Sequence, residues 1–182
     1  MLRKLGRSYP PQFELLPLFL LFAGVYLAAT YYPLLPSRIP THFDFWGVPD
    51  GWGGKDSIFA LPVINAVVYV IITVISVLLA TVKDPRKLIN LPQKRKAALT
   101  DAQVERLRVF LNQCLFALKV LIQGMMVYLI YITIEIATGR AGGLEQYWFL
   151  FIIAIGALVL HMVGKSFCIA TPEKKIGLAI KG

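Results

Sequence analysis

Long apolar runs alternate with shorter polar segments along the chain. The runs cover about 15–32, 59–82, 110–138 and 147–163, and each is long enough to cross the hydrocarbon core of a bilayer as a helix. A polar segment, 33–56, follows the first run, and a basic segment, 83–106, follows the second. The pattern predicts an all-α membrane protein, in which residues 1–182 form a single integral membrane domain built as a four-transmembrane-helix bundle. Because the first run is longer than a typical signal-peptide core, we expect it to remain as an uncleaved helix.

The positions of lysine and arginine predict the orientation of these helices. Three precede the first run, eight lie in 83–108 and four follow the fourth run, whereas 33–56 holds two and the segment between the third and fourth runs holds one. Cytoplasmic segments of membrane proteins carry the excess of positive charge. The counts therefore predict that both termini and the basic segment lie inside, and that 33–56 forms an extracytoplasmic loop.

Composition agrees with a membrane protein and argues against other classes. Hydrophobic residues make up 57% of the chain, which is more apolar surface than a soluble domain of this length can bury. The net charge of +9 lies beside the apolar runs without a nucleic-acid-recognition motif, so we expect contact with anionic lipid and not with nucleic acid. The two cysteines, Cys114 and Cys168, have no metal-ligand spacing and are expected to be free thiols.

Local signals predict how some helices begin and pack. Asp56 or Ser57 is a suitable N-cap for the second helix, and Thr100 with a glutamine three residues later predicts a capping box that starts the third helix in water. Gly24 and Ala28, four residues apart, allow close packing of the first helix against a neighbour.

Polar residues at helical spacing mark one face of the second helix. Asn65, Tyr69, Thr73 and Ser76 share this face. In a bilayer a polar face points toward other helices, where it finds hydrogen-bond partners. We interpret it as an interhelical hydrogen-bonding face, with a solute path as the alternative.

The third and fourth helices add further intramembrane candidates. Asn112, Lys119 and Gln123 form one stripe, and Lys119 is expected to extend toward the cytoplasmic interface. Glu135 is predicted to be solvated near the outer interface, at the height of the 33–56 loop. His161 is expected to hydrogen-bond to a neighbour rather than to bind a ligand.

The 33–56 loop has the composition of a compact folded cap. It contains four prolines and four glycines, and Val48-Pro49-Asp50-Gly51 is a strong turn signal. The residues before the turn alternate as in an extended strand, so we expect a cap or a hairpin on the outer ends of the helices. Gly51 or Gly53 is expected in a left-handed conformation. Aromatic side chains should bury against the helix ends or the lipid interface, namely Phe43, Phe45, Trp46 and Trp52.

The same loop holds the candidate binding residues. His42 and Asp44 leave an extended strand on the same face, and Asp50 can fold back toward them across the turn. These three residues can bind a divalent metal or equally form a hydrogen-bonded structural triad. Because H-x-D is a pattern of low specificity, they are weak metal candidates, and no cofactor is predicted. The predicted binding set is His42, Asp44, Trp46, Asp50, Trp52 and Lys55.

Catalytic signatures give no reason to expect an enzyme. The sequence has no H-E-x-x-H, no G-x-S-x-G and no glycine-rich phosphate loop. We therefore expect that the protein is not an enzyme.

The loop resembles that of a known family. Its pattern from Leu35 to Lys55, L-P-x-x-I-P-x-H-F-x-x-x-G-x-P-D-G-W-G-x-K, is similar to the membrane domain called domain of unknown function 1648, which also begins the SdpI-type bacterial immunity proteins. The resemblance implies a multi-pass protein of a bacterial or archaeal cytoplasmic membrane with this loop outside. SdpI-type proteins protect against a secreted toxic peptide. Their further C-terminal membrane pattern is not found here, and Asp44 stands where an asparagine is usual.

The first functional hypothesis is a binding protein whose outer loop recognises a peptide, a lipid or another membrane protein. The alternatives are a small accessory subunit of a larger membrane complex, a toxin-immunity protein, and a metal-dependent membrane enzyme or transporter. Each of these acts in the lipid bilayer, with other membrane subunits or a secreted peptide as candidate partners.

Overall fold

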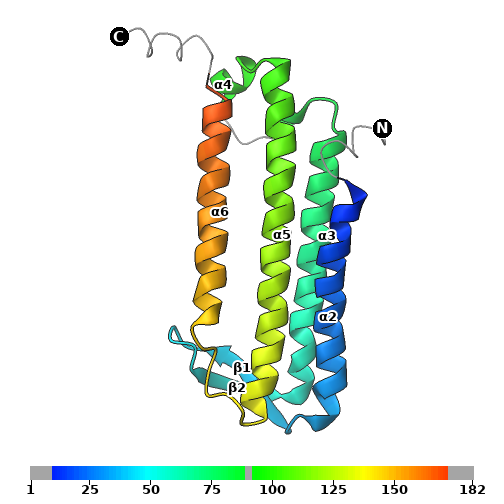
Figure 1. Ribbon diagram of the computed structural model, residues 1–182, viewed down its shortest axis with the longest axis vertical. Helices are drawn as coiled ribbons and strands as arrows, with labels where there is room; N and C mark the ends of the chain where they lie inside the picture. Colours follow the sequence, from blue (N-terminus) through cyan, green and yellow to red (C-terminus); the bar gives the residue numbers. More distant parts are fainter. Residues whose placement is uncertain (1–9, 89–91, 172–182) are drawn as a thin grey trace.

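Four long helices dominate the computed structural model, which describes residues 10–88 and 92–171 (Figure 1). They are α2 (Leu15–Tyr31), α3 (Ala60–Thr81), α5 (Asp101–Ala137) and α6 (Tyr147–Ile169). Successive helices run in opposite directions. Strands β1 (Arg38–Phe43) and β2 (Pro49–Gly54) lie at one end of the bundle, called here the hairpin end, and the short helix α4 (Gln93–Ala97) lies at the other, called the basic end.

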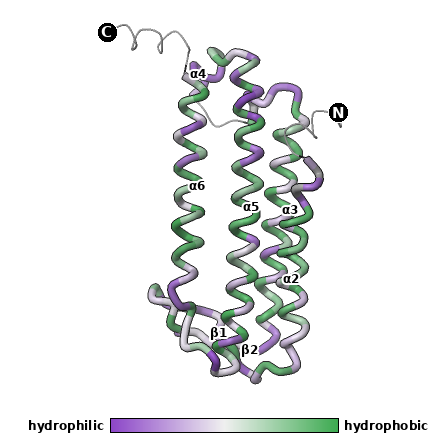
Figure 2. Tube along the Cα trace, viewed as in Figure 1, coloured by the Kyte–Doolittle hydropathy of each residue, from purple (hydrophilic) through white to green (hydrophobic). Residues whose placement is uncertain are grey.

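These helices are long and apolar enough to cross a membrane. Figure 2 shows hydrophobic residues along most of their length and hydrophilic residues gathered toward the two ends of the bundle. The prediction that each of the four apolar runs forms a helix is confirmed, and two of the helices are longer than predicted. α5 begins at Asp101, ahead of its apolar run, and α6 continues to Ile169, past the predicted end at 163.

Helix α5 is the centre of the bundle, since α2, α3 and α6 each pack against it. Gly24 and Ala28 of α2 are buried, and a Cβ atom at Gly24 would lie 3.0 Å from Cδ1 of Ile130 on α5. The predicted close packing through these small residues is confirmed. α6 is different, because none of its residues is buried and α5 is its principal helix partner.

An apolar cluster closes the bundle at the hairpin end. It joins α2, α5, the hairpin and the 3₁₀ helix just before α3, and each member is at most 6% exposed. We call it the apolar plug, and its buried members are Ala28, Leu35, Ile39, Ile58, Ile130 and Ile134. Through Ile39 the hairpin is part of the protein core rather than an appendage.

The strands form an antiparallel hairpin, so the hairpin form of the predicted cap is confirmed and the all-α class has to be extended by a small sheet. Ile39 pairs with Gly53 and Phe43 with Pro49, while the ladder is irregular between Pro40 and Phe43. A 3₁₀ helix, η3 (Lys55–Phe59), leads from β2 directly into α3.

The prediction that Asp56 or Ser57 is the N-cap of the second helix was wrong. The N-cap position of α3 is Phe59, because the chain is already helical in η3 when α3 begins. The Ser57 hydroxyl instead donates to the Gly54 carbonyl at 2.6 Å, at the start of η3.

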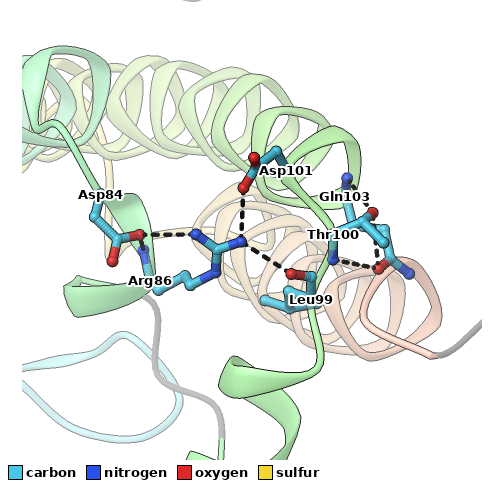
Figure 3. Close-up of polar contacts among 6 residues, drawn as sticks. All are labelled: Asp84, Arg86, Leu99, Thr100, Asp101 and Gln103. Atoms are coloured by element: carbon cyan, nitrogen blue, oxygen red, sulfur yellow. Dashed lines mark hydrogen bonds and ion pairs between the residues drawn. The ribbon is translucent and has the colours of Figure 1, made fainter.

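At the basic end, Arg86 of η4 (Pro85–Lys87) holds the connection between α3 and α5 (Figure 3). Its guanidinium donates to Asp101 at 2.8 Å and to the Leu99 carbonyl at 2.9 Å, and Asp84 lies 3.4 Å away. The hydrogen bond to Asp101 is the main cause that raises the pKa of Arg86 above its usual value. The arrangement positions the first turn of α5.

The predicted capping box at the start of α5 is confirmed. The Thr100 hydroxyl accepts from the Gln103 backbone N–H at 3.2 Å, and the Gln103 side chain accepts from the Thr100 N–H at 3.0 Å (Figure 3). The Gln103 amide also donates to the Ile169 carbonyl at 3.0 Å, which ties the end of α6 to α5.

Arg108 fastens the end of α3 to α5. It is 4% exposed, and it donates to the carbonyls of Ala80 at 2.6 Å and Val82 at 3.0 Å, which otherwise lack helical partners. Glu105 lies 3.2 Å from its Nε. Nearby, Cys114 is a buried free thiol and Cys168 an exposed one, as predicted.

Candidate functional site

Asp44 organises the turn of the hairpin. Its carboxylate accepts the backbone N–H groups of Trp46 at 2.9 Å and Val48 at 2.8 Å. The prediction that Asp44 shares a face with His42 was wrong, because β1 ends at Phe43 and the strand alternation does not reach Asp44. Asp44 is a turn residue whose oxygens are used by the backbone.

A hydrogen bond joins His42 and Asp50 in the cap. Nδ1 of His42 lies 2.5 Å from the Asp50 carboxylate, and the two side chains are 73% and 47% exposed. This contact fixes the ring and leaves Nε2 as its second hydrogen-bonding atom. Without Asp44 the predicted three-ligand metal set is incomplete, and among residues 10–88 and 92–171 no three His, Cys, Asp or Glu side chains gather as a metal site.

Asp44→Ala is expected to lower the free energy of unfolding by about 1–2 kcal/mol, because two backbone donors lose a charged acceptor. Asp50→Ala, which removes only an exposed contact with His42, should leave stability nearly unchanged. Thermal unfolding followed by tryptophan fluorescence would compare them. Equal effects of the two substitutions would contradict the assignment of Asp44 to the turn.

Gly51 and Gly53 are required for close approach rather than for a left-handed turn. A Cβ atom at Gly51 would lie 2.8 Å from Cβ of His42, and one at Gly53 would lie 2.7 Å from Cγ2 of Thr41. The expected left-handed conformation was wrong for both, and within the hairpin only Gly47 has it, with φ of 82°. β2 therefore passes directly over the side chains of β1.

The aromatic residues of the cap lie mostly on its surface. Phe45, Trp46 and Trp52 are 69%, 74% and 46% exposed, so their predicted burial against the helix ends was wrong; the lipid-interface alternative stays a prediction. Phe43 is an exception, since it packs beside the buried Leu144. Lys55 Nζ lies 4.5 Å from the centre of the Tyr32 ring.

A hollow of about 490 Å³ lies beneath the hairpin, between α3, α5 and α6; we call it the cap pocket. Its walls are almost entirely apolar, and strand β1 covers its end. Polar groups enter mainly from the hairpin side, through Thr41, His42 and Ser57. The helix walls are Leu61 and Ile64 of α3, Met125, Leu129 and Thr133 of α5, and Trp148 and Ile152 of α6.

The chain from α2 through the hairpin into α3 has the features of the resemblance noted above. Residues 18–66 match the family described as Domain of unknown function (DUF1648). No curated protein and no solved structure matches the chain. The DUF1648 region supplies the hairpin and the α3 side of the cap pocket, whereas α5 and α6 lie outside it.

The intramembrane candidate Lys119 lies inside the bundle. It is fully buried, and its Nζ donates to Glu14 at 2.6 Å and to the Thr73 hydroxyl at 2.8 Å. The expectation that Lys119 extends to the interface was wrong, because Glu14 comes to it from the start of α2. Tyr69 completes the group by donating to the other Glu14 oxygen at 2.8 Å.

Four further polar residues of the second and third helices are buried in the same interface. Asn65, Ser76, Asn112 and Gln123 are each 0% exposed, and the Gln123 side-chain amide donates to the backbone carbonyl of Asn65 at 3.2 Å. The predicted polar face of the second helix is therefore confirmed as a helix–helix contact, and the stripe of the third helix lies against it, a position that the sequence did not predict.

Glu135 and His161 lie apart from this group. Glu135 receives two hydrogen bonds of 2.7 Å from Arg140 at the hairpin end. These bonds are the main cause that raises the pKa of Arg140 above its usual value. His161 is exposed on α6 and packs edge-on to Phe110, with ring centroids 5.7 Å apart.

Sequence reasoning missed two parts of this arrangement. Glu14 precedes the first apolar run, and no local pattern pairs it with Lys119, which lies 105 positions away. The cap pocket was also missed, because its walls come from separate helices whose packing no local pattern reveals. For Glu14, the one available signal was a lone acid beside a run that lacks any other charge.

Proposed function

We propose that this chain is a membrane-embedded binding protein that holds an acyl chain of a bilayer lipid in the cap pocket. The observation that carries the proposal is the 490 Å³ apolar hollow between helices long enough to cross a membrane. Its volume falls in the range of small-molecule sites, which are mostly apolar with a few polar groups that set orientation.

The shape of the α3–α6 side of α5 favours a long chain over a compact ligand. A second apolar hollow, of about 250 Å³, lies nearer the basic end between the same three helices. Its lining residues are Ile75, Leu78, Leu79, Leu88, Leu111, Leu115 and Met162. Two hollows on one side of α5 suit an extended hydrocarbon that enters from the surrounding bilayer.

The polar groups of the cap pocket suit the head of such a lipid. They lie on the hairpin side, where His42 is oriented by Asp50 and keeps Nε2 available. The indole N–H of Trp148, which also lines the pocket, is buried without a partner among the described residues. An ester or phosphate oxygen would accept from the Trp148 indole N–H, whereas a head-group hydroxyl would donate to Nε2 of His42, because the Nδ1 hydrogen is used by Asp50.

The orientation of the chain in the membrane follows from the positive-inside rule. Arginine and lysine concentrate in 83–108, at the basic end, so this end faces the cytoplasm and the cap pocket opens in the outer leaflet. In a bacterial or archaeal cytoplasmic membrane the lipid bound would be one of the outer leaflet. Within residues 10–88 and 92–171 no specific contact favours toxin immunity or an accessory-subunit role over lipid binding, and both stay predictions.

Ile64→Trp is expected to reduce bound lipid about tenfold. Ile64 is 47% exposed and lines the cap pocket, so a larger side chain enters the hollow from its edge. In a bilayer the chain gains no hydrophobic energy by leaving lipid, and its affinity rests on packing. The loss of about ten atom–atom contacts removes about 1–2 kcal/mol of dispersion energy. Native mass spectrometry of protein released from nanodiscs measures the retained lipid.

Leu160→Trp is the matched control, because Leu160 is 75% exposed on α6 and does not line the pocket. It should retain lipid as the unmodified protein does. Equal lipid retention by the two variants would count against the cap pocket as the site. Recovery of a peptide in place of lipid would replace this proposal with the peptide-binding hypothesis.

A further inference from the structure

Polar residues follow one continuous line along the contact between α3 and α5, which we call the polar seam. Three hydrogen bonds set its antiparallel register: Gln123 with Asn65, Lys119 with Thr73, and Arg108 with Ala80. The same register places Ser76 opposite Asn112, between the Lys119 and Arg108 layers. The seam thus carries polar groups at intervals of one to two helical turns.

Most polar side-chain atoms of the seam residues on either side of Lys119 lack hydrogen-bond partners among the described residues. Both amide atoms of Asn65, both of Asn112, the Gln123 carbonyl oxygen and the Ser76 hydroxyl are buried without a hydrogen-bond partner among the described residues. Each of these four residues is 0% exposed. Buried polar atoms in folded proteins are almost always hydrogen-bonded, to protein or to ordered water.

Water is the ligand that fits these atoms. Each layer offers donors and acceptors together, at Asn65 with Gln123 and at Ser76 with Asn112, as a bridging water requires. Lipid tails offer no hydrogen bonds, and a cation would lie within about two helical turns of the Lys119 ammonium. A neutral molecule with both hydrogen-bonding roles therefore suits the seam best.

The two ends of the seam differ in their access to solvent. At the hairpin end the apolar plug covers it, with Ile130 and Ile134 of α5 at 0% and 1% exposure. At the basic end Arg108 meets Glu105, whose side chain is 56% exposed. Glu14, the partner of Lys119, keeps 18% exposure. Polar contacts therefore connect the seam to the surface on the basic side.

We propose that the polar seam binds two groups of internal water molecules, one at Asn65 and Gln123 and one at Ser76 and Asn112, which flank the Glu14–Lys119 ion pair. The water enters from the basic end and stops at the apolar plug. The ion pair is thus hydrated inside a bundle whose outer surface is apolar. This inference is independent of lipid binding in the cap pocket, since the two sites share no residue.

Water-edited solid-state NMR of the full chain in bilayers tests this proposal. With asparagine, glutamine and isoleucine labelled, and signals assigned by sequential backbone spectra, magnetisation is transferred from water to nearby groups. The expected result is transfer to the side-chain amides of both Asn65 and Asn112. Gln93, exposed on α4, is the positive control, and the Ile130 methyl group in the apolar plug should receive none.

Absence of transfer to Asn65 and Asn112 would overturn the proposal, because the seam would then be dry. Transfer to one amide alone would overturn it as well, since both groups of water are claimed. Equal transfer to the Ile130 methyl group would refute closure at the plug. No substitution is needed, so the result does not depend on whether a variant folds.

Discussion

Glu14→Met is expected to lower the free energy of unfolding by about 3–5 kcal/mol, the cost of leaving a buried charge without its counter-charge. The substitution deprives Lys119, which is 0% exposed, of its carboxylate at 2.6 Å. Lys119→Met should cost less, because Glu14 keeps 18% exposure and the hydrogen bond from Tyr69. Chemical unfolding in detergent or bicelles, followed by the tryptophan fluorescence, measures both.

The double variant Glu14→Met with Lys119→Met separates loss of the pair from loss of one charge. Replacement of a whole buried pair by apolar side chains is often close to neutral, so the double variant should be more stable than Glu14→Met alone. Lys165→Met, on an exposed residue of α6, serves as the control and should change stability by less than about 0.5 kcal/mol. If Glu14→Met matched this control, the ion pair would have no structural importance.

The long helices could be predicted from sequence because their signal is local. A run of apolar residues long enough to cross a bilayer has one stable form there, a helix whose backbone bonds are internal. The polar faces were equally visible, since residues spaced by three or four positions share a side. Hence the sequence predicts that Asn65 faces the protein interior, where it is 0% exposed.

The interactions between helices could not be predicted in the same way. Lys119 near one end of an apolar run is compatible with extension to the interface, and the choice depends on where Glu14 lies in space. The contact joins positions 105 residues apart, through the packing of α2 on α5. The cap pocket has the same origin, because it exists only where α3, α5 and α6 fail to fill the space between them.

The sequence predicted a hairpin but not the residue at which strand β1 ends, because that depends on the backbone pairing of the two strands. Proline and glycine signals located the turn, but the predicted alternation of side chains between the two faces of the strand continued as far as Asp44. The irregular ladder between Pro40 and Phe43 and the early end of the strand placed Asp44 in the turn. Glycine likewise has two uses, freedom of φ and lack of a Cβ atom, and sequence alone does not distinguish Gly47 from Gly51.

Gly47→Val is expected to lower the free energy of unfolding by about 2–5 kcal/mol, because strain and overpacking act together at this residue. Its φ of 82° is a conformation that β-branched residues avoid, and a Cβ atom there would lie 2.9 Å from Cβ of Leu144. The Gly47 carbonyl also accepts the Leu144 N–H at 2.8 Å, so displacement of the turn would separate the hairpin from the segment before α6.

Gly54→Val is the matched control for this loss. Gly54 ends β2 with φ of −65°, and no atom lies within 4 Å of the position that its Cβ would take. Valine should therefore be accepted there with little change in melting temperature, while Gly47→Val lowers it clearly. Because Trp148 lies beside Gly47 and lines the cap pocket, Gly47→Val should also reduce lipid retention, which Gly54→Val should leave intact. Equal melting temperatures for the two variants would show that the turn does not hold the hairpin over the pocket.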